Sequence, residues 1–104
     1  SRGLGDVYKR QIMNYGSKQW KKKRNKILRR DKYKDKIKAR FGITEDATIV
    51  HHIYPSDEYP EYAWEDWNLI SVSNSTHREL HKKDGSLTQK GIELMQRTIP
   101  EEKK

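Results

Sequence analysis

Four histidines are the side chains of this sequence best suited to holding a metal ion or moving a proton. His77 and His81 stand four positions apart, which in a helix places both imidazoles on one face within reach of a common ion. His51 and His52 are adjacent at the end of the β-branched run TIVHHIYP. Because neighbouring side chains of an extended strand point to opposite faces, the sequence predicts two different roles for this adjacent pair.

Two basic helices are predicted ahead of these histidines. The first spans 17–30 with Ser17 as its cap, and the second spans 32–41 and ends at Gly42. Each has one apolar stripe, and its other faces are basic. The stripe residues are Trp20, Ile27 and Leu28 in the first helix and Tyr33, Ile37 and Phe41 in the second.

The remaining predicted elements surround the histidines. Strands are predicted at 47–53 and 69–72, and the acidic loop between them carries aromatic rings that we expect to pack over a small core. A helix opens at a capping box of Thr76 and Glu79 and continues through the second histidine pair to the DGS break. A last helix covers 87–98, and its expected buried residues are Leu87, Ile92, Met95 and Ile99.

The composition limits both the fold and the partner. With 104 residues, 32% of them hydrophobic, and no cysteine, the chain can build one small core without a disulfide, which leaves a histidine-bound metal as added support. The formal charge is +8, and residues 18–40 hold thirteen Lys or Arg against two acids, a bias that favours a polyanion such as nucleic acid. No apolar run approaches the ~18 residues of a membrane span, so no membrane association is expected.

The first eleven residues, SRGLGDVYKRQ, show no apolar period and resemble one translated frame of a transposase-based sequencing-library adapter. We therefore expect residues 1–11 to be a non-native peptide. Residues 12–104 are expected to form one domain, with its motif core at about 47–83.

Three spaced segments, ATIVHHIYP, WNLISVS and THRELH, resemble the motifs of the HNH, or ββα-metal, endonucleases. The basic stretch WKKKRNKILRRDKY is similar to the helical lead-in of many phage members, so the resemblance covers about Trp20 to Thr98. It implies an α+β fold in which a small ββα-metal core follows two basic helices and precedes a C-terminal helix. It also implies an endonuclease that hydrolyses phosphodiester bonds in DNA with the help of a divalent metal ion.

The resemblance further implies roles for individual residues. The implied metal ligands are His51, His77 and His81, the implied general base is His52, and Asn68 is expected to hold His52 or its loop in register. An all-imidazole shell suits zinc, nickel, cobalt or manganese better than magnesium, and no small-molecule cofactor is expected. The expected nucleic-acid contacts are Lys21, Lys22, Lys23, Arg24, Arg29, Arg30 and Arg78.

DNA is the partner that the resemblance implies, phage packaging proteins are further candidate partners, and the expected location is the cytoplasm of a bacterial host carrying a phage or prophage.

The sequence departs from many family members because it lacks two CxxC pairs that bind a structural zinc ion. The corresponding segments here read YKDKIKARFG and SVSNSTH. We expect Tyr33, Ile37, Phe41 and the loop aromatics to replace that zinc by apolar packing.

Two other interpretations fit part of the sequence. A nonenzymatic nucleic-acid-binding module could use the histidines to hold a structural metal, although such a site needs four ligands and His52 lies on the wrong face of its strand. An acidic protein partner for the basic helices is supported by charge alone.

Overall fold

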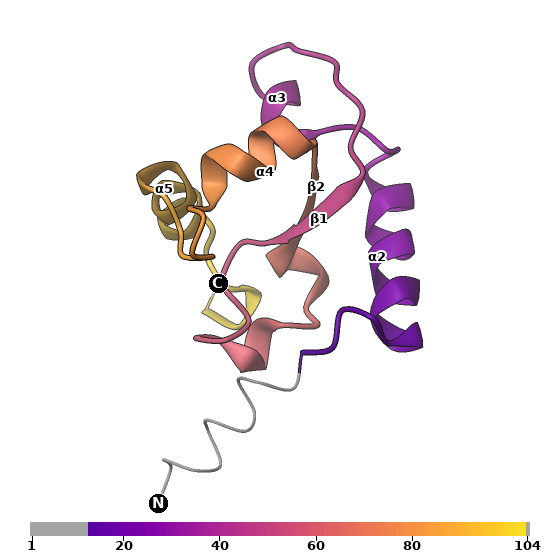
Figure 1. Ribbon diagram of the computed structural model, residues 1–104, viewed down its shortest axis with the longest axis vertical. Coiled ribbons are helices and arrows are strands. Elements are labelled where there is room, and N and C mark those ends of the chain that lie inside the picture. The colour runs from indigo at the N-terminus through magenta and orange to yellow at the C-terminus, as the bar shows by residue number, and fades with distance from the viewer. Residues whose placement is uncertain (1–12, 104) are drawn as a thin grey trace, which may run out of the picture.

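The computed structural model describes residues 13–103, so the expectation for residues 1–11 lies outside the described residues. A two-stranded antiparallel hairpin stands at the centre, with one long helix on one side and two helices on the other (Figure 1). The elements are, in chain order, α2 (Lys18–Arg30), α3 (Lys36–Ala39), β1 (Ile49–His52), η1 (Pro60–Tyr62), η2 (Asp66–Asn68), β2 (Leu69–Val72), α4 (Asn74–Leu80), α5 (Gln89–Arg97) and η3 (Glu101–Lys103). Within residues 13–103, no helix has the length and apolar character needed to cross a membrane.

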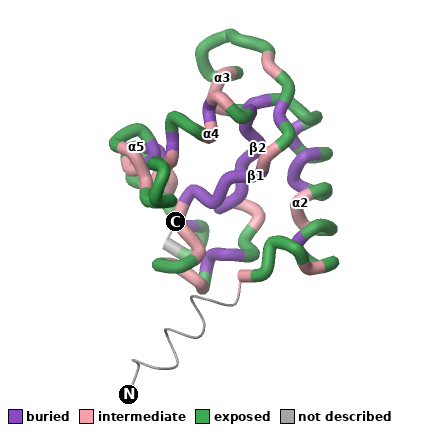
Figure 2. The backbone as a smooth tube through the Cα atoms, viewed as in Figure 1, coloured by how far each residue is buried: buried purple, intermediate pink, exposed green. Residues whose placement is uncertain are grey.

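Helix α2 forms where the sequence predicts it. The Ser17 hydroxyl accepts a hydrogen bond from the Trp20 amide at 3.1 Å and so caps the first turn. The three stripe residues of α2 are buried and pack against Val50 of β1 and Leu69 of β2. Figure 2 shows the buried residues following both strands and the inner face of α2. The hairpin is therefore held against α2 on one face, and a second apolar cluster joins its other face to α4 and α5.

The second helix is much shorter than the sequence predicts. Two residues with positive φ, Lys32 at 56° and Tyr33 at 59°, turn the chain after α2. Helix α3 begins only after Asp35, whose carboxylate accepts hydrogen bonds from two amides of its first turn. The predicted stripe is consequently wrong, because Tyr33 is 51% exposed and Phe41 is 76% exposed, whereas Ile37 does pack on the core.

Helix α4 begins earlier than the predicted capping box. Strand β2 ends at Val72, and the Ser73 hydroxyl at once caps the helix by accepting a hydrogen bond from the Thr76 amide. Thr76 is therefore buried inside the first turn instead of preceding it. The helix ends at Leu80, and His81 already has an extended backbone.

Helix α5 packs on α4 through a stripe that differs in part from the predicted one, although Met95 does pack against the shared core. Gly91 lies so close to α4 that a Cβ there would come within 2.4 Å of the Leu80 carbonyl oxygen, and Leu94 is buried in the shared core. Ile99 is 58% exposed because the helix has already ended at Arg97, so its predicted burial is wrong.

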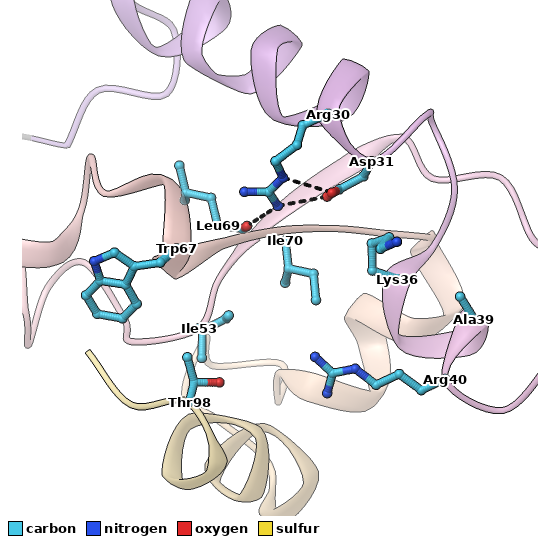
Figure 3. Close-up of a pocket in the computed structure, with 10 residues that line it drawn as sticks. All are labelled: Arg30, Asp31, Lys36, Ala39, Arg40, Ile53, Trp67, Leu69, Ile70 and Thr98. Carbon is cyan, nitrogen blue, oxygen red and sulfur yellow. Dashed lines mark hydrogen bonds and ion pairs between the residues drawn. The ribbon is translucent and has the colours of Figure 1, made fainter. Parts of the chain in front are cut away.

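The outer edge of β2 is covered by side chains. Figure 3 shows Arg30 joined both to Asp31 and to the Leu69 carbonyl, at the rim of a cavity of about 460 Å³. Three bonds reach the strand and the residue after it, namely Arg30 to the Leu69 carbonyl (2.7 Å), the Ser71 amide to Asp31 (3.0 Å) and the Ser73 amide to Asp35 (2.8 Å). Asp35 thereby links segments 33–42 and 71–77, so a polar contact joins them where apolar packing was expected.

Candidate active site

Three histidines from β1 and the end of α4 converge beside the hairpin. One imidazole nitrogen from each of His51, His77 and His81 lies within 4.8 Å of the others. Nδ1 of His51 is 3.1 Å from Nε2 of His81. The tight turn from β2 into α4 brings the helix back over β1, and it thereby gathers residues that are thirty positions apart in the sequence. The structure thus brings together the side chains predicted as a ligand set.

The DGS turn orients His81. Gly85 adopts a φ of 90°, which favours glycine, and its carbonyl lies 3.0 Å from Nδ1 of His81. Because a carbonyl can only accept, Nδ1 carries the hydrogen, which leaves Nε2, the atom turned toward His51, as the ring nitrogen available to bind a metal. Backbone bonds of this kind commonly fix the tautomer of a metal-binding histidine.

The histidine cluster fits a divalent cation. His51 is 1% exposed, and burial, together with His81 and His77, holds the pKa of His51 well below its usual value of 6.5. Burial also lowers the pKa of His77. Neutral imidazoles offer lone pairs to a metal, and Nε2 of His51 is buried without a hydrogen-bond partner among the described residues. Three imidazole ligands leave coordination positions open for a substrate.

His52 faces the opposite side of β1 and lies against α2. Its ring is stacked on Trp20, with the ring centroids 5.1 Å apart and the planes inclined by 19°. Nε2 is 3.0 Å from the Ala63 carbonyl and must therefore carry the hydrogen, so Nδ1 keeps the lone pair. Burial lowers the pKa of His52, and this effect exceeds the opposite effect of the bond to Ala63. His52 is consequently a neutral imidazole whose Nδ1 can accept a proton.

Asn68 holds the loop that contacts His52. Its side chain is fully buried, and its Oδ1 accepts a hydrogen bond from the Tyr54 amide at 2.7 Å. Its Nδ2 donates to the carbonyls of Tyr54 (3.1 Å) and Tyr62 (3.0 Å). Tyr62 immediately precedes Ala63, so Asn68 acts on His52 through the loop, one of the two arrangements that the sequence left open.

All four histidines line one cavity of about 620 Å³, a volume in the range of small-molecule sites. The cavity beside the edge of β2 contains none of them. Tyr15 and Trp20 also line the histidine cavity. The sequence predicts Trp20 as a core residue, whereas Tyr15 lies outside every predicted element, and a single tyrosine ahead of a helix carries no local signal of a site.

The predicted nucleic-acid contacts fall into three groups. Lys23 is 2.6 Å from Asp66 and Arg30 is 2.9 Å from Asp31, so both side chains serve the fold. Arg24 lines the histidine cavity. The four contacts that are exposed and have no ion pair or hydrogen bond to a described side chain are Lys21, Lys22, Arg29 and Arg78.

No family model and no curated protein matches this sequence. A solved structure does match, namely the crystal structure of the HNH endonuclease of the deep-sea thermophilic bacteriophage GVE2 with a manganese ion. The two chains share 26% sequence identity, and the match has a TM-score of 0.64 over 71% of this chain and 84% of the phage protein. The predicted fold class is thereby confirmed: this chain has the ββα-metal fold of the HNH endonucleases.

Proposed function

We propose that this protein is a metal-dependent DNA endonuclease that hydrolyses phosphodiester bonds. The observation that carries the proposal is the convergence of His51, His77 and His81 in one cavity with His52. The similarity to an HNH endonuclease crystallised with manganese supports metal-dependent nuclease chemistry. Manganese is therefore the first metal to test, followed by zinc, nickel and cobalt, which imidazole ligands also suit.

The proposed reaction divides the work between the two faces of β1. A divalent cation held by the three imidazoles would supply positive charge to the scissile phosphate and to the departing 3′ oxygen. On the other face, Nδ1 of His52 takes a proton from the water that attacks phosphorus opposite that oxygen. The products are a 5′ phosphate and a 3′ hydroxyl.

Two neighbours prepare His52 for this step. The Ala63 carbonyl fixes the hydrogen on Nε2, and the stacked Trp20 ring limits rotation of the imidazole. Asn68 is a positioning residue, because it holds the loop that presents the Ala63 carbonyl. A general base placed in this way typically contributes about 10²–10⁴-fold to the rate.

Cleavage of supercoiled plasmid in a metal series, with and without chelator, tests the proposed function. We expect activity to disappear in chelator and to return with manganese. The variant His77→Ala should bind metal at least about tenfold more weakly and should cut more slowly, because it removes one of three ligands. Asn74→Ala, an exposed position in the first turn of the same helix, should behave like the parent. Cleavage that persists unchanged in chelator would refute the metal-dependent mechanism.

A nonenzymatic nucleic-acid-binding module with a structural metal is the second candidate. It predicts metal binding and DNA binding without cleavage under any of these conditions. The nuclease is favoured because the cluster of described residues contains three ligands, one short of a closed structural site, and because His52 retains a free nitrogen in the same cavity.

A further inference from the structure

An aromatic wall runs from His52 to the mouth of the histidine cavity. Trp20 is 4% exposed and covers one face of His52. Tyr15 meets both rings edge-on, with centroid distances of 5.4 Å to Trp20 and 6.0 Å to His52. Tyr15 is 54% exposed, so much of its ring is accessible at the cavity. The wall therefore ends in an accessible aromatic surface next to the proposed general base.

The ring of Tyr15 is held in place before any ligand binds. Its hydroxyl is 3.2 Å from Oγ of Ser56, a residue of the loop after β1 that also lines the cavity. The turn that carries Tyr15 is closed by two hydrogen bonds to Asn14. The Asn14 side chain accepts one from the Gly16 amide at 2.9 Å, and the Asn14 carbonyl accepts the other from the Ser17 amide at 3.1 Å. A ring that is already ordered loses little conformational entropy when a ligand stacks on it.

The charges around the cavity suit a phosphate beside the aromatic surface. Arg24 and Lys82 line the cavity, and Asp57 is the single acidic residue among its lining residues. Arg24 uses one of its terminal nitrogens to donate to the Thr48 carbonyl at 3.2 Å and another to donate to Asn25, and Lys82 is exposed. An aromatic ring, two cations and the histidine cluster in one cavity together match a nucleotide, with its base on the ring and its phosphate at the histidines.

We propose that Tyr15 stacks an unpaired base next to the phosphate that is cut, so the preferred substrate is DNA with unpaired nucleotides at the cleavage site, such as a single strand or a flap. This inference rests on the proposed nuclease function. In continuous duplex both faces of a base are covered by its neighbours, and the base must leave the stack before it can meet the ring. An unpaired base has a free face and stacks on an aromatic side chain irrespective of sequence.

Binding measured in chelator tests the proposal without cleavage. The probes are a fluorescein-labelled thymidine oligonucleotide and a mixed-sequence duplex of the same length. Tyr15→Leu keeps an apolar contact with Trp20 but removes the ring, and we expect it to bind the single strand about tenfold more weakly with little change for the duplex. Tyr15→Phe keeps the ring and should bind the single strand within about twofold of the parent. Phe41→Leu is the matched control, because Phe41 is 76% exposed and lies outside the cavity.

Three results would overturn the stacking role of Tyr15. An equal loss of affinity for both probes in Tyr15→Leu would assign the residue to general DNA binding or to folding, which a thermal melt of the variant separates. An equal loss in the Phe and Leu variants would assign the effect to the hydroxyl. Unchanged binding in Tyr15→Leu would exclude stacking altogether.

The cleavage readout keeps this inference separate from the proposed function. Ring-dependent binding of the single strand by a protein that cuts no DNA would refute the nuclease and leave the stacking site standing. Equal kcat/KM for single-stranded and duplex DNA, unaltered in Tyr15→Leu, would refute the inference and leave the nuclease standing.

Discussion

The tautomer of His52 decides which of its nitrogens can act as a base. The chain places two histidines next to each other, and the alternation of the strand sends them into different surroundings. His51 meets two other imidazoles, whereas His52 meets an aromatic ring and a backbone carbonyl. Two adjacent histidines can therefore have different chemical roles, because they lie on opposite faces of one strand.

This separation predicts the behaviour of His52→Ala. The variant should lose about 10²–10⁴-fold in kcat, because no other described side chain presents a free imidazole nitrogen to the same face of the strand. Its affinity for manganese should stay within a few fold, because the three predicted ligands are untouched. Plasmid cleavage and calorimetric metal titration measure the two quantities. A variant that binds no metal would reverse the assignment of His51 and His52.

The short helix α3 and the start of helix α4 depend on each other through Asp35. This carboxylate is fully buried. It accepts hydrogen bonds from two backbone amides of the helix and from both the amide and the hydroxyl of Ser73. We expect Asp35→Ala to lower the free energy of unfolding by about 3 kcal/mol, because buried donors lose their acceptor. Asp46→Ala, which removes an exposed ion pair to Lys34, should change it by less than about 0.5 kcal/mol. Urea denaturation compares the two variants, and equal losses would contradict the role given to Asp35.

Two buried aspartates make the stability of the fold depend on pH. Burial by itself raises the pKa of Asp31, but hydrogen bonds from Arg30 and Ser71 outweigh it and hold the pKa below the usual 3.8. The same balance lowers the pKa of Asp35. A carboxylate whose pKa is lowered by folding contributes its full stabilisation above about pH 4. That contribution is lost as the pH falls through the pKa of the carboxyl in the folded protein. We therefore expect the melting temperature to fall steeply below about pH 4, and less steeply in Asp31→Asn. A parent protein whose melting temperature is flat across this acidic range would rule out the contribution.

Local signals allowed some elements to be predicted and not others. Helix α2 carries its own cap and stripe, and β2 is a short, largely apolar run with β-branched Ile70 and Val72, so both were predicted correctly. The start of α3 was not, because the chain turns at Lys32 and Tyr33 with positive φ, a conformation that these two residue types do not signal. The convergence of the histidine ligands follows from motif spacing, whereas the contact of His52 with Ala63 depends on a loop conformation that no local pattern encodes.

Across the whole molecule, the basic residues of α2 are divided between folding and solvent. Lys23 and Lys26 both bond Asp66, and these bonds lower the pKa of that carboxyl. Lys21 and Lys22 are exposed and have no such partner among the described residues. The number of basic residues in the sequence is therefore larger than the number of side chains available to contact DNA. The expected packaging-protein partners remain a prediction.

DNA affinity should reflect this division. Replacing Lys21 and Lys22 with Gln should flatten the slope of log affinity against log salt by up to about 1.8 if both contact phosphate, at roughly 0.9 per contact. The paired change of Lys23 and Lys26 to Gln is the control, and its slope should stay near that of the parent because Asp66 already occupies those ammonium groups. Fluorescence anisotropy over a salt series gives the slopes. Equal slopes for all three proteins would show that this helix does not face DNA.

The covered edge of β2 also bears on how copies of this protein behave toward one another. A two-stranded hairpin is small enough that an open edge could recruit a strand from a neighbouring molecule and begin an ordered aggregate. Here the amides of Ser71 and Ser73 are already bonded to aspartates carried by the chain after α2. Protonation of those carboxylates weakens both bonds, because an amide donates more strongly to a carboxylate than to a carboxylic acid. We therefore expect copies of the protein to associate more readily through this edge below about pH 4, and light scattering over a pH series measures that association.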